Sequence, residues 1–528
     1  MIEKIIVKNF KVFKDLEINL NDGRNIIVGE NGVGKSSVLQ GISWILSGSK
    51  RVIEDIGIES LFNKEVIREY MDSERTIASL PILYFEVYLR DMSDINSLSL
   101  NGKHNSLHIE ATGLGLYVKA NTDMFSKEIR QSLEGEGIFP FEYYELNYHT
   151  FSGSRYDSYS KKHKFKYEFI NTSKLNSKYG LKRYVSNLLS KSTTSEKKQH
   201  LKLAFRTSIE SFSNKLYSDY ELEQTGDYKI EVSTTGDQSF ENSLTATSNQ
   251  VPVNLAGEGE QLLLGIESSL DNIDEKIRII LLEEPENHLS YLNMQRLINM
   301  LDKSYNQQMI LTTHNNMIAS RLGIQNLIML SKEEEVKLKQ LSNGTNSFFE
   351  KSPNNNLLNY ILSNKIILVE GAAEYILLDK FYELFSKGDS FADNSISLIS
   401  VNGLNFKYYL EIAQKLNLSV VVLTDNDKNF KKKVEEKYAE YMDSKNIYVS
   451  SDKDDNRYTF EVCLYGDNKD FLTSKMETPQ MTNGIKNFML SNKTEFALRL
   501  LNQLEDNSDN NFQIPEYILE AFRWIDAR

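Results

Sequence analysis

A glycine-rich segment near the start of the chain restricts its fold more than any other feature. Residues 29–36 read GENGVGKS and fit the pattern G-x-x-x-x-G-K-[ST], between a strand-like run, Asn25–Val28, and a helical pattern, Lys35–Leu46. Such a loop turns its backbone N–H groups and the start of the helix toward phosphate oxygens. Lys35 would reach the β and γ phosphates, and Ser36 would ligate Mg²⁺. The motif predicts an α/β domain that binds a nucleoside triphosphate with Mg²⁺.

A second motif supplies the carboxylates that such a site requires. The apolar strand Ile279–Leu282 ends in Glu283 and Glu284. We expect Glu283 to hold the Mg²⁺ ion and Glu284 to orient or deprotonate the attacking water. His314 follows another apolar strand, Met309–Leu311, where it would contact the γ phosphate. A lone histidine after a strand is usually structural, so its role depends on the neighbouring motifs.

These segments resemble the ABC-type ATPases of DNA repair and chromosome maintenance over residues 1–95 and 222–335. The matching motifs are NFK at 9–11, the glycine-rich loop, a degenerate signature segment LAGEGEQ at 255–261, EEPENHL at 283–289, which runs from Walker B into the D-loop, and TTH at 312–314. The resemblance implies ATP as the nucleotide and a homodimer in which the signature segment of one head completes the site of the other. It implies nucleotide or Mg²⁺ contacts from Lys11, Asn31, Gly32, Gly34, Lys35, Ser36, Ser37, Gly257, Gly259 and Glu283.

Two departures from the ABC-type pattern predict slow hydrolysis. Glu283 stands where aspartate is commoner, and no segment matches the glutamine loop.

Acidic residues follow two strands of a second αβ series. Glu370 ends the strand Ile366–Val369, with Glu374 one helical turn later, and Asp425 and Asp427 follow another apolar strand. Because parallel strands bring their carboxyl ends to one edge of a sheet, the four acids are expected to converge. Clustered carboxylates favour a divalent cation, and Mg²⁺ or Mn²⁺ prefers such oxygen ligands. Either half of this pattern alone is common on solvated strand ends.

This second series resembles a Toprim domain, and the whole chain resembles the OLD (overcoming lysogenisation defect) nucleases, a family that includes the large subunit of the Gabija anti-phage system. The resemblance adds Glu461 as a further metal-binding acid and Lys493 as a catalytic lysine. It implies direct ligation of one ion by Glu370, Asp425 and Asp427, and completion of a second ion site by Glu374 and Glu461. The assignments of Glu461 and Lys493 each have an alternative, because either residue could be an ordinary surface side chain.

The predicted architecture is an α/β ATPase head with a helical insertion, followed by a Rossmann-like Toprim domain. The expected limits are 1–95 and 222–335 for the ATPase, 96–221 for a helical, basic insertion that could serve dimerisation, 336–359 for a linker, and 360–528 for the Toprim domain with its helical extension.

Charge is distributed unevenly along the 528 residues. The net charge is −13, which disfavours bulk capture of nucleic acid, yet residues 155–206 contain fourteen Lys or Arg against three acids. Within this segment, residues 161–167 (KKHKFKY) interleave lysines with aromatics, as a DNA-binding surface would, although a solvated dimerisation helix is an equal alternative. Lys431–Lys433 are better placed to hold a DNA backbone near the metal site.

Composition excludes several classes of protein. No apolar run approaches a membrane-spanning length, and the chain begins with strand-like residues, so neither a membrane protein nor a signal segment is expected. A single cysteine, Cys463, fits a reducing cytoplasm and rules out a cysteine-based zinc site.

The leading hypothesis is a nucleotide-regulated, metal-dependent DNA endonuclease, and the family resemblance adds a role in anti-phage defence. Its partners would be DNA, a second copy of the chain or a higher homo-oligomer, and a helicase-like or reverse-transcriptase protein. A scaffold or sensor whose Toprim domain binds without cutting is the alternative. A topoisomerase or primase uses the same metal module and is the third possibility.

Overall fold

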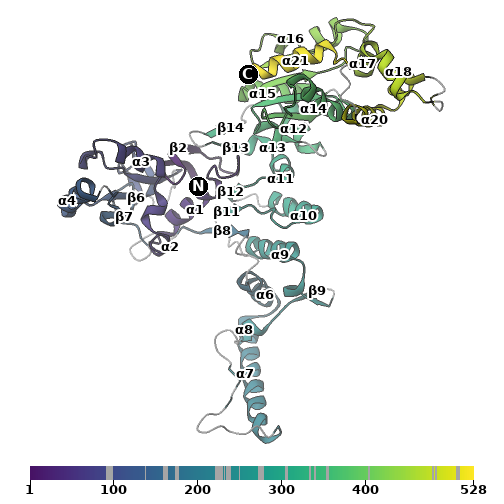
Figure 1. Cartoon of the computed structure of the whole chain (residues 1–528). Coiled ribbons are helices and arrows are strands. Elements are labelled where there is room, and N and C mark those ends of the chain that lie inside the picture. Colours follow the sequence, from purple (N-terminus) through teal and green to yellow (C-terminus); the bar gives the residue numbers. More distant parts are fainter. Residues whose placement is uncertain are drawn as a thin grey trace. The chain divides into compact units, whose positions relative to one another are not determined.

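The computed structural model describes residues 1–90, 99–136, 138–157, 165–172, 178–220, 230, 232–233, 240–248, 250–271, 279–303, 307–331, 335–337, 341–352, 356–401, 403, 405–478, 481, 484–506 and 512–528 (Figure 1). These residues divide into two compact units. The first comprises Met1–Ile27, Asn31–Thr313 and Leu330–Glu335, and the second comprises Val28–Glu30, His314–Met329 and Val336–Arg528.

The first unit contains an antiparallel sheet in the order β2-β1-β4-β6-β5, with β7 paired to β6. Its strands are β1 (Ile2–Phe10), β2 (Phe13–Asn19), β4 (Leu83–Leu89), β5 (Asn101–Gly102), β6 (Ala111–Ala120) and β7 (Tyr144–Thr150). Val7, Phe85 and Leu116 occupy paired positions on three adjacent strands, and all three are fully buried. The alternation of apolar and polar residues therefore buries one face of this sheet.

Residues 111–150 contribute two strands to this sheet, in a segment that the sequence assigned to a helical insertion. β6 pairs with β4 on one side and with β7 on the other. Gly113 and Gly115 interrupt the apolar pattern of β6, and the rings of Phe151 and Tyr117 fill the space where their side chains would stand. Glycine is unfavourable in strands, so the pattern resembles a loop until its neighbours are known.

A parallel sheet in the first unit carries the nucleotide motifs. Its strands β3 (Arg24–Val28), β12 (Gln308–Thr312), β11 (Ile279–Glu283) and β8 (Tyr167–Asn171) are adjacent in that order. β11 pairs with both β12 and β8 in parallel. The central strands are buried on both faces, as continuous apolar runs such as Ile279–Leu282 predict. The sequence predicted β11 and β12 but missed β8.

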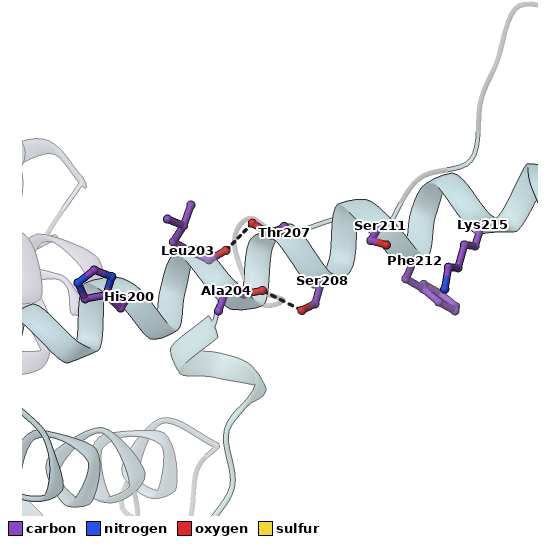
Figure 2. A pocket seen from close by; sticks show the side chains of 8 residues that line it. All are labelled: His200, Leu203, Ala204, Thr207, Ser208, Ser211, Phe212 and Lys215. Carbon is purple, nitrogen blue, oxygen red and sulfur yellow. Dashed lines mark hydrogen bonds between the residues drawn. The ribbon is translucent and has the colours of Figure 1, made fainter.

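The helical segment of the first unit consists of α6 (Lys178–Ser192), α7 (Ser195–Ser218), α8 (Phe240–Ser243) and α9 (Glu258–Asp271). Figure 2 shows eight side chains that line one side of α7. Two of its apolar side chains, Leu203 and Phe212, are exposed, and the Thr207 and Ser208 hydroxyls donate to carbonyls one turn earlier. This side of α7 therefore mixes apolar and polar groups.

The second unit contains a four-stranded parallel sheet in the order β16-β15-β17-β18. The strands are β15 (Lys365–Val369), β16 (Ile396–Ser400), β17 (Ser419–Leu423) and β18 (Ile447–Ser450). All four were predicted from sequence, because both faces of such a sheet are covered and the strands are correspondingly apolar. Its helices are α12 (Asn343–Lys351), α13 (Leu357–Ile361), α14 (Ala372–Ser386), α15 (Phe406–Leu416), α16 (Ala439–Met442), α17 (Phe460–Asp467), α18 (Lys469–Met476), α19 (Gly484–Ser491), α20 (Lys493–Asp506) and α21 (Glu516–Asp526).

Further elements complete the architecture. In the first unit these are α1 (Lys35–Ser47), α2 (Arg51–Ile56), α3 (Lys64–Asp72), α4 (Thr122–Gln131), β9 (Thr247–Ser248), β10 (Val251–Pro252) and α10 (Tyr291–Asp302). Where the chain passes between the units lie α11 (Asn316–Arg321), β13 (Leu327–Leu330) and β14 (Glu335–Lys337). Among the described residues, no helix is both long and apolar enough to cross a bilayer. The predicted α/β class is confirmed.

Candidate functional site

The glycine-rich loop connects β3 to α1. Gly32 and Gly34 have φ angles of 78° and 103°, in the left-handed region that favours glycine. Gly34 is also the N-cap residue of α1, and a Cβ atom there would collide with the side chains of Phe13 and Val12. Position 34 therefore requires glycine both for its backbone conformation and for close packing. Asn31 and Gly32 are exposed at the tip of the loop.

Lys35, the first residue of α1, is buried although it carries a charge. Burial lowers the pKa of Lys35, and the carboxylates of Glu284 and Glu286 act against this decrease. Ser36 and Ser37 follow on the first helical turn and are half-buried. The fold thus brings the lysine of the loop within electrostatic reach of the acids that follow β11.

The acids at the end of β11 are held by residues that the sequence motifs did not single out. Asn171 Nδ2 donates to Glu283 Oε2 at 2.6 Å, and the Thr172 hydroxyl donates to the carbonyls of Glu283 and Glu284 at 3.1 and 3.2 Å. Glu284 has a φ of 41°, and its N–H donates to the Thr312 carbonyl. Asn171 and Thr172 lie at the end of β8, in a segment of weak periodicity that gave no signal of a strand.

Lys11 approaches the same acids from the turn after β1. Its ammonium donates to Gln40 Oε1 at 3.0 Å and lies 5.1 Å from the centroid of the Trp44 ring. Burial lowers the pKa of Lys11, and the charge of Glu283 acts against this decrease. Lys11, Lys35, Glu283 and Glu284 therefore form one charged cluster around the loop.

The signature segment packs against the D-loop segment within the same chain. Gly259, near the start of α9, leaves no room for a Cβ atom because the carbonyl oxygen of His288 lies there. His288 Nδ1 is 3.6 Å from Glu258 Oε2. Gly257 is exposed, with open space around its Cα. Close packing explains the glycine at position 259 but not the one at 257.

His314 follows directly after β12 and Thr313. The Thr313 N–H donates to the Ile27 carbonyl at 3.2 Å, and the Thr313 hydroxyl donates to Glu286 Oε1 at 2.7 Å. His314 itself is exposed and belongs to the second unit.

The second cluster forms where β15 and β17 end side by side. The Thr424 hydroxyl donates to Glu370 Oε1 at 2.6 Å, and the Asp425 N–H donates to the same oxygen at 3.2 Å. Asp425 Oδ1 in turn accepts from the N–H of Phe460, the first residue of α17, at 2.8 Å. The acids of two strands meet at one edge of the sheet, as the strand order requires.

Three helices bring further charged groups to this edge. Glu374 lies in the first turn of α14, Glu461 in the first turn of α17, and Lys493 begins α20. Lys493 Nζ is 3.0 Å from Glu461 Oε2, and Glu461 is only 1% exposed. A helix start is a favourable place for a carboxylate because of the helix dipole.

Negative charge accumulates in this cluster. Burial raises the pKa of Asp425 to about 8, and the carboxylates of Glu370, Glu374 and Glu461 add to the increase. Burial likewise raises the pKa of Glu374, with Glu461 and Glu370 contributing. Burial alone would lower the pKa of Lys493, but the Glu461, Asp425 and Glu374 charges raise it. The five residues therefore share one electrostatic environment.

Asp427 is directed elsewhere. It is exposed, has a φ of 48°, and its Oδ2 lies 2.9 Å from Lys433 Nζ. Between the two aspartates, Asn426 is buried and donates to the carbonyls of Asp452 and Asp454. The structure thus brings Glu370, Glu374, Asp425, Glu461 and Lys493 together, whereas Asp427, which the sequence grouped with them, forms a separate ion pair with Lys433.

The donor set of this cluster fits a divalent cation. It offers carboxylate oxygens, which Mg²⁺ and Mn²⁺ prefer, and the pKa of Asp425 is raised first by burial and then by the neighbouring carboxylates, whose repulsion a cation would relieve. Within the described part of the chain, no three acidic, His or Cys side chains already stand in ligating geometry. Glu461 and Asp427 are paired with lysines instead. Ligation would therefore require these side chains to turn toward the ion.

Tyr517 on α21 lines the small hollow beside Asp425, together with Glu374 and Phe460. Burial raises the pKa of Tyr517, and the charges of Cys463, Asp425 and Glu374 add to the increase. Nothing in the sequence connected Tyr517 with the acids, because its helix comes after several others.

The structure describes only part of the two basic segments, residues 161–167 and Lys431–Lys433. Residues 161–164 lie outside the described residues, so the interleaved lysines of that segment stay a prediction. Lys431 and Lys432 are exposed after the Asp425 loop, whereas Lys433 is paired with Asp427.

Two family models match the chain. Residues 361–427 match the model described as "Overcoming lysogenization defect protein-like, TOPRIM domain", and residues 1–207 match the model described as "AAA ATPase domain". The first match contains Glu370, Glu374, Asp425 and Asp427, and the second contains the glycine-rich loop.

Curated relatives agree with these matches. "Endonuclease GajA" of Bacillus cereus (strain VD045) is 25% identical over 461 residues, which is 81% of this chain and 75% of the relative. The "DNA double-strand break repair Rad50 ATPase" of Thermoplasma acidophilum is 40% identical over 78 residues, 14% of this chain and 9% of the relative. A solved structure of the C-terminal region of the Xanthomonas campestris pv. campestris OLD protein aligns with a TM-score of 0.23 at 18% identity, covering 32% of this chain and 95% of that one.

Proposed function

We propose that this chain is a metal-dependent DNA endonuclease controlled by nucleotide. It joins an AAA ATPase domain to an OLD-like Toprim domain and is homologous to endonuclease GajA. Its substrate is DNA, its nucleotide is ATP with Mg²⁺, and its Toprim site takes Mg²⁺ or Mn²⁺. The proposal includes a role in defence against phage, which rests on the likeness to GajA and not on any residue.

One observation carries the proposal: four carboxylates and a lysine from five elements gather at one sheet edge. Burying like charges together is unfavourable, and a fold keeps them only where a cation or a reaction compensates. Ion pairing alone does not explain the position of Asp425, because the charges that most affect its pKa are three carboxylates and a single lysine, Lys493.

Each residue has a role in phosphodiester cleavage. Glu370 and Asp425 would hold one ion, and Glu374 and Glu461 a second, with Asp427 joining after release from Lys433. A bound ion would supply Lewis-acid stabilisation and an activated water. Lys493, 3.0 Å from Glu461, would turn its ammonium to the phosphate and stabilise the charge that develops there. Thr424 and the Phe460 N–H orient Glu370 and Asp425.

The ATPase domain would regulate this chemistry. Lys11, Lys35 and the acids after β11 surround the glycine-rich loop, and Gly257 and Gly259 would meet the nucleotide of a second copy in a head-to-head dimer. A helicase-like or reverse-transcriptase partner would act with the complex.

The decisive experiment incubates the purified protein with supercoiled and linear DNA across Mg²⁺, Mn²⁺ and nucleotides. We expect metal-dependent cleavage, which Asp425→Ala abolishes while ATP binding persists. Asp443→Asn, at an exposed acid of the same unit, is the matched control and should cleave normally. Absence of cleavage under every condition would favour a scaffold or sensor, and full activity of Asp425→Ala would refute the metal assignment.

A further inference from the structure

A hollow of about 650 Å³ lies on the antiparallel sheet of the first unit, and no residue of the glycine-rich loop lines it. It is lined by side chains from β1, β4, β6 and β7 and from the loop that precedes β6; those used below are Lys8, Tyr84, Lys103, His104, Tyr117 and His149. Its size lies within the range of small-molecule sites. None of these residues belongs to the two clusters described above.

The floor of the hollow is a set of stacked rings. Tyr117 and His149 stack with centroids 3.9 Å apart and planes 6° apart, and the Tyr84 ring lies 6.3 Å from Tyr117. Tyr117 lies over Gly115, where a Cβ atom would come 2.7 Å from its ring. The missing side chain at position 115 therefore allows the ring to lie flat along its own strand.

A buried carboxylate fixes this floor from beneath. Glu86 is fully buried and accepts hydrogen bonds from the hydroxyls of Tyr117 and Tyr88 at 2.7 and 2.9 Å. The N–H and the hydroxyl of Ser106 donate to it as well, each at 2.7 Å. A buried carboxylate with four donors is costly to build and holds its neighbours rigidly. Glu86 thus anchors both the stacked rings and the loop that carries Ser106.

The same loop places cationic groups at the rim. Asn105 fastens it by donating to the Ile109 carbonyl at 2.7 Å, and His108 has a φ of 54°, which a non-glycine residue rarely adopts. Lys103 and His104 extend from this loop, and Lys8 extends from β1. Within the described chain, neither lysine forms an ion pair, including with Asp15, the residue opposite Lys8.

His149 offers a defined hydrogen-bonding atom. Burial lowers the pKa of His149, which favours the neutral imidazole. Nδ1 lies 3.1 Å from the Thr150 carbonyl and donates to it, so in the neutral ring Nε2 is an acceptor.

We propose that this hollow is a second nucleotide-binding site, with the base against the rings of Tyr84, Tyr117 and His149 and the phosphates toward Lys8 and Lys103. Flat aromatic rings bind any base by stacking, and lysines bind phosphate as point charges. Lys103 on the anchored loop and Lys8 on β1, neither ion-paired within the described residues, lie beside these rings, so the hollow matches both halves of a nucleotide. The site is independent of the glycine-rich loop and of DNA cleavage.

The test uses full-length protein with Lys35→Ala, which removes the main phosphate contact of the first site, and fluorescent N-methylanthraniloyl-ATP as the probe. We expect the probe still to bind, and adding Lys8→Glu with Lys103→Glu to weaken binding by about ten-fold. Lys64→Glu, at an exposed lysine on α3, is the matched charge reversal and should change nothing. His149→Ala, which removes one ring without touching Glu86, should weaken binding several-fold with the melting temperature preserved.

Two results would overturn the proposal. One is a Lys35→Ala protein that binds no probe, or binds it equally well after the double charge reversal. The other is a double variant that loses affinity for a short DNA duplex while its nucleotide affinity is unchanged, which would make the hollow a DNA contact.

Discussion

The two charged clusters of this protein are built in opposite ways. Around the glycine-rich loop, the residues proposed to bind phosphate are successive, and their geometry follows from two glycines and the start of α1. In the Toprim domain, the acids come from β15, α14, β17 and α17, and the lysine comes from α20. The first cluster is set by local backbone geometry, whereas the second exists only when distant elements pack. In the second cluster, burial together with the charges of Glu370, Glu374 and Glu461 raises the pKa of Asp425 to about 8.

Among the tests of this comparison, the largest expected effect concerns Lys493, the lysine of the Toprim cluster. Lys493→Ala should lower the rate of DNA cleavage by about 10²- to 10³-fold, because it removes the cation that would stabilise the developing phosphate charge. Quantified gel cleavage at saturating Mg²⁺ measures this. Lys469→Ala, at an exposed lysine on α18, is the control. Equal rates for the Lys493→Ala and wild-type proteins would show that Lys493 only neutralises Glu461.

In the cluster around the glycine-rich loop, ATP binding should depend on the backbone conformation of Gly34. Gly34→Ala should reduce ATP affinity by about 100-fold, since a Cβ atom there is strained at a φ of 103° and collides with Phe13. Gly23→Ala is the matched control, because nothing lies within 4 Å of its Cβ position. Calorimetric titration with ATP distinguishes the two variants. Similar affinities for both would mean that the loop adapts to a side chain.

The raised pKa of Asp425 should make the stability of the folded protein depend on pH. The pKa of Asp425 is about 8 in the folded protein and about 4 when unfolded, so its contribution to stability is fully present below pH 4 and lost as the pH rises through 8. Asp425→Asn should therefore raise the melting temperature of the metal-free protein by a few degrees at pH 8.5 and by clearly less at pH 5. Scanning calorimetry at both pH values tests this, and an equal gain at both would contradict it.

The smallest effect concerns the ion pair outside the cluster. Lys433→Ala should release Asp427 and lower the Mg²⁺ concentration for half-maximal cleavage by about two- to five-fold, because exposed ion pairs contribute little. Lys432→Ala, at the neighbouring exposed lysine, separates this effect from a general loss of positive charge. A higher Mg²⁺ requirement for Lys433→Ala alone would mean that Lys433 orients Asp427 instead of sequestering it.

Sequence patterns predicted the strands and helices that continuous periodicity marks. β11, β12 and all four strands of the Toprim sheet follow from apolar runs, and the acids at their ends follow from the rule for parallel sheets. β6, β7 and β8 escaped prediction. Glycines interrupt β6, and their purpose is visible only once the rings of Phe151 and Tyr117 are seen to occupy their space.

The sequence alone determined the phosphate loop, because contiguous residues with fixed backbone preferences need no distant partner. It also determined which acids could meet, because strand order sends them to one edge. Only the tertiary structure decided which acids do meet. It pairs Glu461 of the cluster with Lys493, and it pairs Asp427 with Lys433 outside the cluster. It alone placed Asn171, Thr172 and Tyr517 beside the clusters. Side-chain contacts between elements depend on packing distances, and one-dimensional periodicity does not encode them.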